Sequence, residues 1–321
     1  MKKYLIYIIA VVVIVLIGAE LFLRVYYGFC DAVLATESAK YEYIAQPSQD
    51  RFRFRNTIKY NSLSMRSEEI DTAAILILGF GDSVINGGVQ TDHGSLATTI
   101  LSDTLTKLYN KKVQFLNIAM GSWGPDNCYA YLNEHGDLGA RHIFLFVSSH
   151  DAYDNMTFEK IVDHHESYPS SQYPLALIEL VDRYLLPRIE RLTKTTNSDV
   201  NELVINKKNE NSVFNPGFTS FLSYCREKNI PLTLYLHAEQ DELAAGAYND
   251  QGQEIIKFAK ENDLPIILDL ENGLDQSFFR DQIHINSEGQ KNLAQTILNT
   301  FTQGPTQADK NESVIKSKPA I

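Results

Sequence analysis

The chain has 321 residues, enough for one large α/β domain or two small ones. Hydrophobic residues make up 44% and charged residues 21%, which excludes a collagen-like or wholly disordered chain. A net charge of −11 argues against a general nucleic-acid binder, because neutralising phosphates requires a positive surface. The three cysteines lie far apart, so their spacing indicates neither a disulfide scaffold nor a structural metal domain.

An apolar run without a charge begins at Tyr4, after two lysines, and its apolar character continues to Arg24. This is about the twenty residues that a helix needs to cross a hydrocarbon core of ~30 Å. A cleaved signal peptide would have a shorter apolar region and a small-residue cleavage site. We therefore predict a cytoplasmic stub over 1–3 and a retained transmembrane anchor over 4–24. The positive flank places the rest of the chain outside the cytoplasm, in the periplasm or on the outer face of the cell membrane.

Five apolar runs along the body have the character of strands buried on both faces of a parallel sheet. They cover 74–79, 113–118, 142–147, 231–236 and 265–270. Between and after them, apolar residues recur at helical spacing over 95–109, 216–228, 251–261 and 287–301. Alternating strands and helices predict an α/β fold: a three-layer α/β/α sandwich with a five-stranded, flavodoxin-like parallel sheet, preceded by one transmembrane helix.

The main domain is expected over 75–302. Outside the alternating pattern we predict a tether and lead-in over 25–74 with an edge strand at 51–55, an insertion over 155–214, and a disordered tail over 303–321. The insertion contains an amphipathic helix over 175–191 and a polar stretch over 194–212 that is expected to be a mobile loop. Its position between the third and fourth strands would allow it to cover a site.

In an open parallel sheet, ligands bind beyond the carboxyl ends of the strands. Ser83 follows the first strand on a turn flanked by glycines, and His284 precedes the last helix, with Asp281 three residues earlier. A serine hydroxyl is inert until a base takes its proton, and a histidine oriented by a carboxylate is such a base. The pattern predicts Ser83 as nucleophile, His284 as base and Asp281 as the residue that orients it.

Four blocks, GDSVINGG at 81–88, GSWGPDN at 121–127, SSHD at 148–151 and DQIH at 281–284, together resemble the SGNH/GDSL hydrolase superfamily. The resemblance covers about 56–300 and is closer to a membrane-anchored bacterial branch linked to cell-envelope polysaccharides and exopolysaccharides. It implies the same catalytic triad. It also implies that backbone N–H groups of Ser83 and of Ser122 or the adjacent Gly121 form an oxyanion hole.

The third block departs from the family pattern, because His150 stands where the superfamily has the oxyanion-hole asparagine. A neutral imidazole would still donate one hydrogen bond. A protonated ring would instead bind an anionic group, and a third reading is lost hydrolytic activity. The residues expected to contact substrate are Asp82, Trp123, Asn127 and Asp151.

These features predict an extracytoplasmic serine esterase or O-acyltransferase, acting on O-acyl groups such as acetyl of an envelope or exopolysaccharide glycan. The alternative is a catalytically weak, glycan-binding accessory subunit of a polysaccharide biosynthesis or export complex. No cofactor and no metal are expected, because the histidines at 164 and 165 are adjacent and lack metal-ligand spacing. The expected partners are the acylated glycan, the membrane and polysaccharide biosynthesis proteins.

Overall fold

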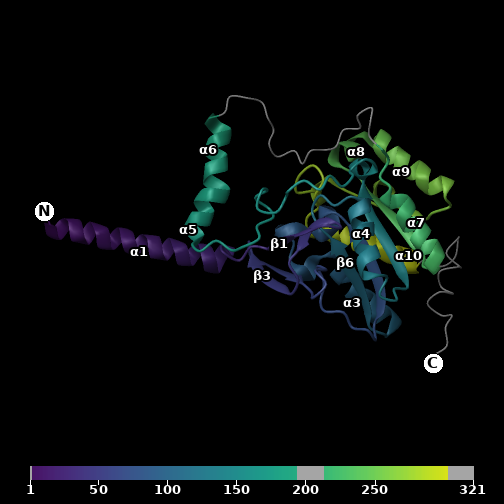
Figure 1. Cartoon of the computed structure of the whole chain (residues 1–321), viewed down its shortest axis with the longest axis horizontal. Coiled ribbons are helices and arrows are strands. Elements are labelled where there is room, and N and C mark those ends of the chain that lie inside the picture. The colour runs from purple at the N-terminus through teal and green to yellow at the C-terminus, as the bar shows by residue number, and fades with distance from the viewer. Residues whose placement is uncertain (1, 194–212, 303–321) are drawn as a thin grey trace.

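A five-stranded parallel sheet forms the centre of the computed structural model, which describes residues 2–193 and 213–302 (Figure 1). Its strands are β5 (Ile75–Gly81), β6 (Val113–Ala119), β7 (His142–Ser148), β8 (Leu232–His237) and β9 (Ile266–Leu268). They lie in the order β6-β5-β7-β8-β9, so the first strand in sequence sits second in the sheet. This is the flavodoxin-like order, and the predicted fold class is confirmed.

Helices cover both faces of the sheet. One face carries α3 (Ala97–Tyr109) and α10 (Ser287–Thr302), and the other carries α4 (Pro125–His135), α7 (Gly217–Lys228) and α9 (Asp250–Glu261). Two shorter helices, α2 (Ser83–Asn86) and α8 (Gln240–Ala245), follow β5 and β8. Side chains alternate between the faces along each strand. Phe144 and Phe146 of β7 therefore join the core under α3 and α10, whereas Leu145 joins the core under α4 and α7.

Residues 31–74, most of the segment expected as a tether and lead-in over 25–74, are folded against the domain rather than extended. They form two antiparallel hairpins, β1 (Ala35–Ser38) with β2 (Glu42–Ala45) and β3 (Gln49–Arg53) with β4 (Asn56–Tyr60). Tyr43, Ile58 and Met65 are buried in the main core. Apart from the edge strand expected over 51–55, these strands are only four or five residues long, too short for a clear alternating pattern.

Two predicted strands need new bounds, and one helix was missed. The edge strand expected over 51–55 ends at Arg53, because the next two residues form a turn at positive φ. The last strand ends at Leu268, where a 3-10 turn begins. Helix α4 was not predicted; Pro125 opens it, and Gly136, at a φ of 72°, ends it. The predicted polar loop and the tail lie outside the described residues.

A long helix, α1 (Lys2–Tyr27), projects from the domain (Figure 1). Among the described residues it is the one helix long and apolar enough to cross a membrane. Near its end lies the amphipathic helix of the insertion, which consists of α5 (Ala176–Glu179), a π-helical stretch η4 (Leu180–Leu185) and α6 (Leu186–Thr193). This helix points across the direction of α1 rather than along it (Figure 1).

A buried ion pair joins the insertion helix to the hairpin of β3 and β4. Arg53 is 2% exposed and Glu179 is 0% exposed, and the guanidinium of Arg53 contacts the carboxylate directly. The same carboxylate accepts a hydrogen bond from the backbone N–H of Cys30 at 2.6 Å and one from Arg183 at 3.0 Å. Arg53 also donates to the carbonyl of Gly28 at 2.8 Å. Each buried charge is therefore compensated, as burial requires.

Replacing Glu179 by alanine should leave Arg53 buried without its partner and cost about 3–5 kcal/mol of unfolding free energy. Chemical denaturation of the full chain in detergent micelles measures this. The control is Glu288→Ala, which removes an exposed pair with Lys291 and should cost no more than about 1 kcal/mol. Equal effects of the two substitutions would contradict the assigned role of the buried pair.

Candidate active site

The three residues predicted to be catalytic, Ser83 and the distant pair Asp281 and His284, are linked by a series of hydrogen bonds. The Oγ atom of Ser83 lies 2.9 Å from Nε2 of His284. The Nδ1 atom of His284 lies 2.9 Å from each carboxylate oxygen of Asp281. Both distances suit proton transfer through the imidazole. The arrangement can activate a serine hydroxyl and stabilise the imidazolium that results.

Local structure at the end of β5 presents Ser83. Asp82 caps α2, because its carboxylate accepts a hydrogen bond from the N–H of Val84 at 2.9 Å. Gly87 ends this short helix at a φ of 76°, a conformation that favours glycine. At Gly81 a Cβ atom would lie 2.9 Å from the carbonyl oxygen of Phe146, so the strand can turn here only without a side chain.

The loop that carries His284 is held in place by hydrogen bonds to the carboxylate of Asp281, a residue of the same loop. Asp281 accepts hydrogen bonds from the backbone N–H groups of Ile283 at 3.1 Å and His284 at 2.8 Å. Partial burial alone would raise the pKa of Asp281, but the hydrogen bonds from His284 outweigh it and hold that pKa well below its usual value. Asp281 is therefore ionised at neutral pH, as an orienting carboxylate must be.

A second histidine–aspartate pair, which is buried, contacts this loop. The sequence analysis assigned this pair no functional role. His237 lies at the end of β8, with Nδ1 2.6 Å from Asp269 and Nε2 2.8 Å from the carbonyl oxygen of Ile283. Both contacts need a donor, so the ring is protonated. Burial alone would lower the pKa of His237, but the carboxylate of Asp269 and these hydrogen bonds raise it. No motif marked this pair, since its residues follow two different strands.

The second block lies beside the nucleophile. A Cβ atom on Gly121 would be 3.9 Å from that of Ser83 and 2.3 Å from the hydroxyl of Tyr168, so any side chain here would displace Tyr168. Ser122 adopts a φ of 58°, and Tyr43 donates to the carbonyl of Gly121 at 2.7 Å. Tyr168 belongs to the insertion. The insertion thus reaches the site, as its place in the sequence suggested.

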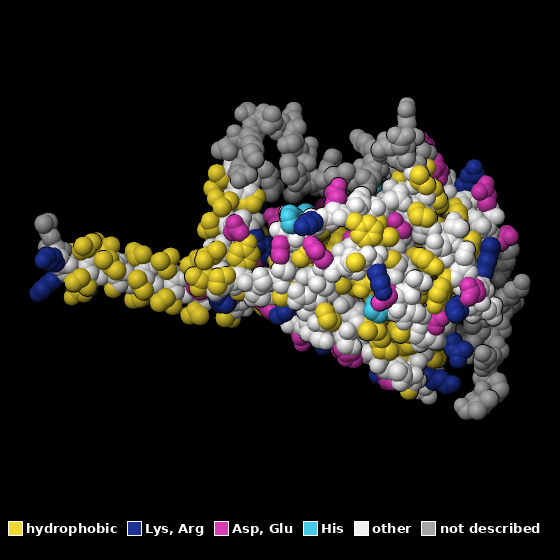
Figure 2. Space-filling view, in the orientation of Figure 1, with side chains coloured by type: hydrophobic (Ala, Val, Ile, Leu, Met, Phe, Trp, Pro, Cys, Tyr) yellow, Lys and Arg dark blue, Asp and Glu magenta, His cyan; other side chains and the backbone are white. Residues whose placement is uncertain are grey.

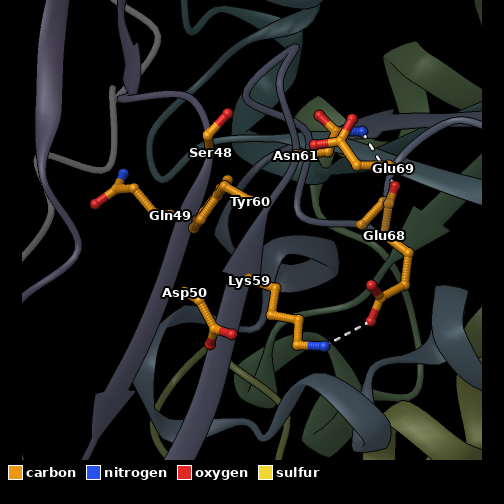
Figure 3. Close-up of a pocket in the computed structure, with 9 residues that line it drawn as sticks. Ser48, Gln49, Asp50, Lys59, Tyr60, Asn61, Glu68 and Glu69 are labelled. Atoms are coloured by element: carbon orange, nitrogen blue, oxygen red, sulfur yellow. Dashed lines mark hydrogen bonds and ion pairs between the residues drawn. The ribbon is translucent and has the colours of Figure 1, made fainter.

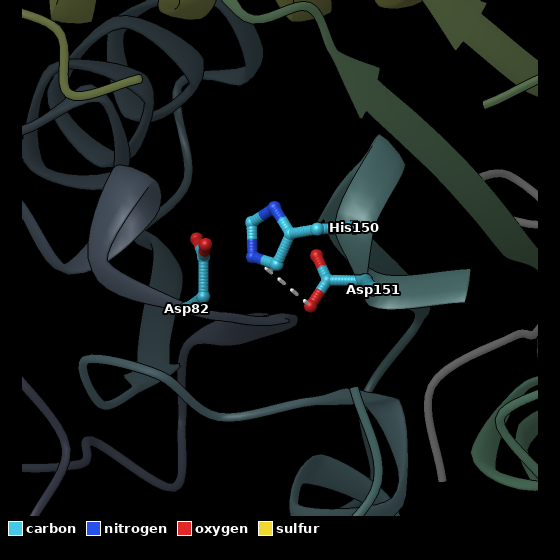
Figure 4. Close-up of side chains that lie close together, drawn as sticks. All are labelled: Asp82, His150 and Asp151. Carbon is cyan, nitrogen blue, oxygen red and sulfur yellow. Dashed lines mark ion pairs between the residues drawn. The ribbon is translucent and has the colours of Figure 1, made fainter. Parts of the chain in front are cut away.

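His150 lies among carboxylates (Figure 4). Its Nδ1 is 3.2 Å from Glu239, and its Nε2 is 3.9 Å from Asp151. Burial alone would lower the pKa of His150, but the neighbouring carboxylates, first that of Asp151, outweigh it and raise the pKa to about 10. These carboxylates therefore favour the imidazolium form of His150 at neutral pH. The sequence analysis left open whether a functional His150 is neutral or protonated, and the geometry favours the protonated ring.

The same cluster is the one grouping of described residues in which three ligand atoms converge. Atoms of Asp82, His150 and Asp151 lie within 4.8 Å of one another. Three such ligands are the usual minimum for a catalytic metal. A protonated ring cannot ligate a metal, so a cation here would compete with the proton on His150.

The four residues expected to contact substrate each have a structural role. Trp123 is 1% exposed and donates through Nε1 to the carbonyl of Tyr43 at 3.0 Å. Asn127 caps α4 by accepting from the N–H of Gly124 at 2.9 Å. Asp82 and Asp151 are buried and accept hydrogen bonds from backbone N–H groups of their own turns. We carry none of the four forward as a substrate contact.

A buried arginine orders the loop after the nucleophile, and it too was missed. Arg66 is 1% exposed and donates to the carbonyls of Asn86 at 2.5 Å and Thr91 at 2.6 Å, and also to that of Gly88. Asn86 in turn donates to the carbonyl of Ala119 at 2.7 Å. The loop after Ser83 is thereby tied to the end of β6. A lone arginine outside the four blocks gave no sequence signal.

Two surface hollows lie away from Ser83. One of about 230 Å³ lies between the β3–β4 hairpin and the following loop, and Lys59 pairs with Glu68 across it at 2.9 Å (Figure 3). The other, of about 290 Å³, is lined by β1 and by Asp163 and Ser170 of the insertion. Neither contains a member of the hydrogen-bond chain, so neither is assigned to the active site.

The sequence matches no protein-family model and no curated protein. Solved structures with partial similarity include the lipase/acylhydrolase from Enterococcus faecalis, at 14% identity over 77% of this chain and 99% of that chain, with a TM-score of 0.42. A two-domain esterase active on acetylated mannans, co-crystallised with mannopentaose, matches at 12% identity over 77% of this chain and 51% of that chain, with a TM-score of 0.42. An acetyl xylan esterase variant from Geobacillus stearothermophilus matches at 12% identity over 71% and 96%, with a TM-score of 0.39. At these low identities and TM-scores, the similarity to lipases and esterases does not identify the functional residues or the substrate of this chain.

The protonated His150 predicts a pH dependence of stability. An unfolded histidine titrates near 6.5 and the folded His150 near 10, so its stabilising contribution is complete below pH 6.5 and is lost as the pH rises through 10. Over that window the unfolding free energy should fall by up to about 1.4 kcal/mol per pH unit from this group. Chemical denaturation of the full chain in micelles at stepped pH measures the slope, and His150→Asn should flatten it. An unchanged slope in His150→Asn would contradict the assignment.

Proposed function

We propose that the chain is a membrane-anchored serine esterase or acyltransferase of the SGNH/GDSL type, with its catalytic domain outside the cytoplasm. One observation carries this proposal: the hydrogen bonds that run from Ser83 through His284 to Asp281. Nucleophile, base and orienting carboxylate stand in the order and at the distances that acyl transfer requires.

The mechanism follows from these contacts. As Oγ of Ser83 attacks the carbonyl carbon of an ester, Nε2 of His284 takes the hydroxyl proton. Asp281 stabilises the resulting imidazolium through Nδ1. The tetrahedral intermediate collapses, the imidazolium protonates the departing alkoxide, and the acyl group remains on Ser83. Water or a sugar hydroxyl then attacks the acyl carbon and loses its proton to His284. As the bond to Ser83 breaks, the imidazolium returns this proton to Oγ of Ser83, and the acyl group leaves on the acceptor oxygen. Hydrolysis and transfer therefore share one intermediate.

The negative oxygen of the tetrahedral intermediate needs donors in fixed positions. We assign to this role the backbone N–H of Ser83 at the start of α2 and that of Gly121 or Ser122. As a third donor we assign Nε2 of His150, which stands where the resemblance places the oxyanion-hole asparagine and which lies 3.9 Å from Asp151, beyond hydrogen-bond distance. A charged donor replacing a neutral amide would stabilise the oxyanion more strongly.

The proposed substrate class is an O-acylated glycan of the cell envelope, such as an acetylated exopolysaccharide. Support comes from the sequence blocks, which resemble an envelope-associated branch, and from α1, which would hold the site beside a polymer made or exported at the membrane. Polysaccharide biosynthesis proteins are the partners that such an enzyme would work with.

A fluorophosphonate probe should label the full chain once, on Ser83, and label Ser83→Ala not at all, because only a serine with an adjacent base is nucleophilic. Turnover of p-nitrophenyl acetate should fall by about 10⁴-fold or more in Ser83→Ala and in His284→Ala, with the double variant no worse than either. Gel fluorescence and absorbance measure the two effects.

Ser220→Ala is the matched control, since this hydroxyl on α7 contacts only a helix carbonyl among the described residues. It should keep full labelling and turnover. A chain that is folded, unlabelled and inactive before any substitution would favour the glycan-binding accessory subunit instead.

The anchor predicts a topology. A phosphatase that is active only outside the cytoplasm should be active when fused after residue 302, and the intact mass of the recovered chain should include α1. Activity of a matched fusion only inside the cytoplasm would contradict the orientation. A mass that lacks α1 would show that the apolar segment is a cleaved signal peptide.

A further inference from the structure

The helix formed by α5, η4 and α6 carries an apolar face that nothing in the described chain covers. Its members are Ile178 at 46% exposure, Val181 at 44%, Leu185 at 42%, Leu186 at 46% and Ile189 at 54%. The opposite face is packed: Ala176 and Glu179 are fully buried, and Tyr184 packs on the rings of Phe29 and Phe54. The helix therefore has one side docked on the domain and one open side that is mostly apolar, with the exposed Asp182, hydrogen-bonded to Tyr173, as its acidic member.

This helix is fixed to the end of α1. The carboxylate of Glu20 accepts hydrogen bonds from the N–H groups of Ala176 at 2.8 Å and Leu177 at 2.9 Å, and so caps the start of α5. Arg24 pairs with Glu20 and donates to the carbonyl of Pro174 at 2.7 Å. Hydrophobic side chains show on the helix on the side toward which α1 projects (Figure 2).

These contacts lie at the position along α1 where a membrane-spanning helix would emerge from the hydrocarbon core into the headgroup region. The uncharged run ends just before Glu20, and the aromatic residues Tyr26 (42% exposed) and Tyr27 (37%) follow in the last turn. Tyrosines gather at the headgroup level of bilayers. Tyr4 and Tyr7 stand at the opposite end, next to the two lysines. The cap at Glu20 thus places α5 at the boundary between acyl chains and headgroups.

We propose that the helix α5–η4–α6 lies in the outer membrane interface, with the face of Ile178, Val181, Leu185, Leu186 and Ile189 inserted among the lipids. This inference rests on the proposed anchoring by α1. An amphipathic helix that lies across a membrane-spanning helix, at the level where that helix emerges, meets the interface along its whole length. Such helices bury their apolar face about 5–10 Å into the boundary region.

The consequence concerns the active site. The segment between the site and this helix is tied at both ends: near the site Tyr168 lies beside Gly121, and next to the helix the carbonyl of Pro174 accepts from Arg24 at 2.7 Å. A single spanning helix leaves a domain free to tilt, whereas a second contact in the membrane plane fixes its orientation. The interfacial helix would hold Ser83 at a set height and direction above the bilayer.

Tryptophan fluorescence in bilayers tests the proposal, because the chain has one tryptophan, Trp123, and it is 1% exposed. Leu185→Trp reports on the interfacial helix, and Val13→Trp, from a site 46% exposed, reports on the middle of α1. Leu108→Trp, from a site 50% exposed on α3, is the control. Each full-length variant is reconstituted into phosphatidylcholine nanodiscs that carry bromine near the glycerol end or near the terminal methyl group of the acyl chains.

The added fluorescence of Leu185→Trp should be quenched to an extent approaching that of Val13→Trp, and more strongly by the shallow bromines. Val13→Trp should be quenched more strongly by the deep bromines, and Leu108→Trp should match the parent chain. An unquenched Leu185→Trp beside a quenched Val13→Trp would overturn the inference and assign the face to a protein partner or a second copy. An unquenched Val13→Trp would overturn the proposed anchor itself. Val181→Trp repeats the measurement should Leu185→Trp not fold.

Discussion

The active-site geometry depends on one hydrogen bond, between Ser83 Oγ and His284 Nε2, which joins residues 201 positions apart. Because β5 is the first strand of a parallel sheet and α10 the last helix of the domain, this contact exists only when the whole domain is folded. Gln290 secures it. This fully buried side chain accepts from the N–H of Ala97 at 2.9 Å and donates to the carbonyl of Val84 at 2.8 Å, so α10 is fixed beside the nucleophile.

Buried charge holds the two loops that meet at this bond. Arg66 ties together the carbonyls of the loop after Ser83, and the pair of His237 with Asp269 supports the loop that carries His284. Hydrogen bonds lower the cost of burying a charge, so the carbonyls bound by Arg66 and the partners of His237 favour one loop conformation over its alternatives. The same principle explains the pair of Arg53 and Glu179, which fixes the insertion helix against the hairpins. The rigid parts of the site are therefore polar networks beneath the surface rather than apolar packing alone.

The sequence predicted the sheet and the residues of the hydrogen-bond chain because both leave strong local signals. Continuous apolar runs mark strands buried on both faces, and the carboxyl-edge rule then brings Ser83 and His284 together. What it missed lacks such signals. Apart from the edge strand expected over 51–55, the hairpins over residues 35–60 are too short to show one. Arg66 and His237 bind backbone carbonyls of distant loops, which no motif records. Trp123 was expected to contact substrate, but its ring is buried and packs against those of Tyr41 and Tyr131.

The most direct test of the account is to trap the acyl-enzyme. If Ser83 is the nucleophile and His284 its base, the full chain quenched in acid during turnover of p-nitrophenyl acetate should carry one acetyl group, and peptide mass spectrometry should place it on Ser83. An acetyl group on another residue, or turnover without any acetylated chain, would contradict the covalent mechanism on which the proposed function rests.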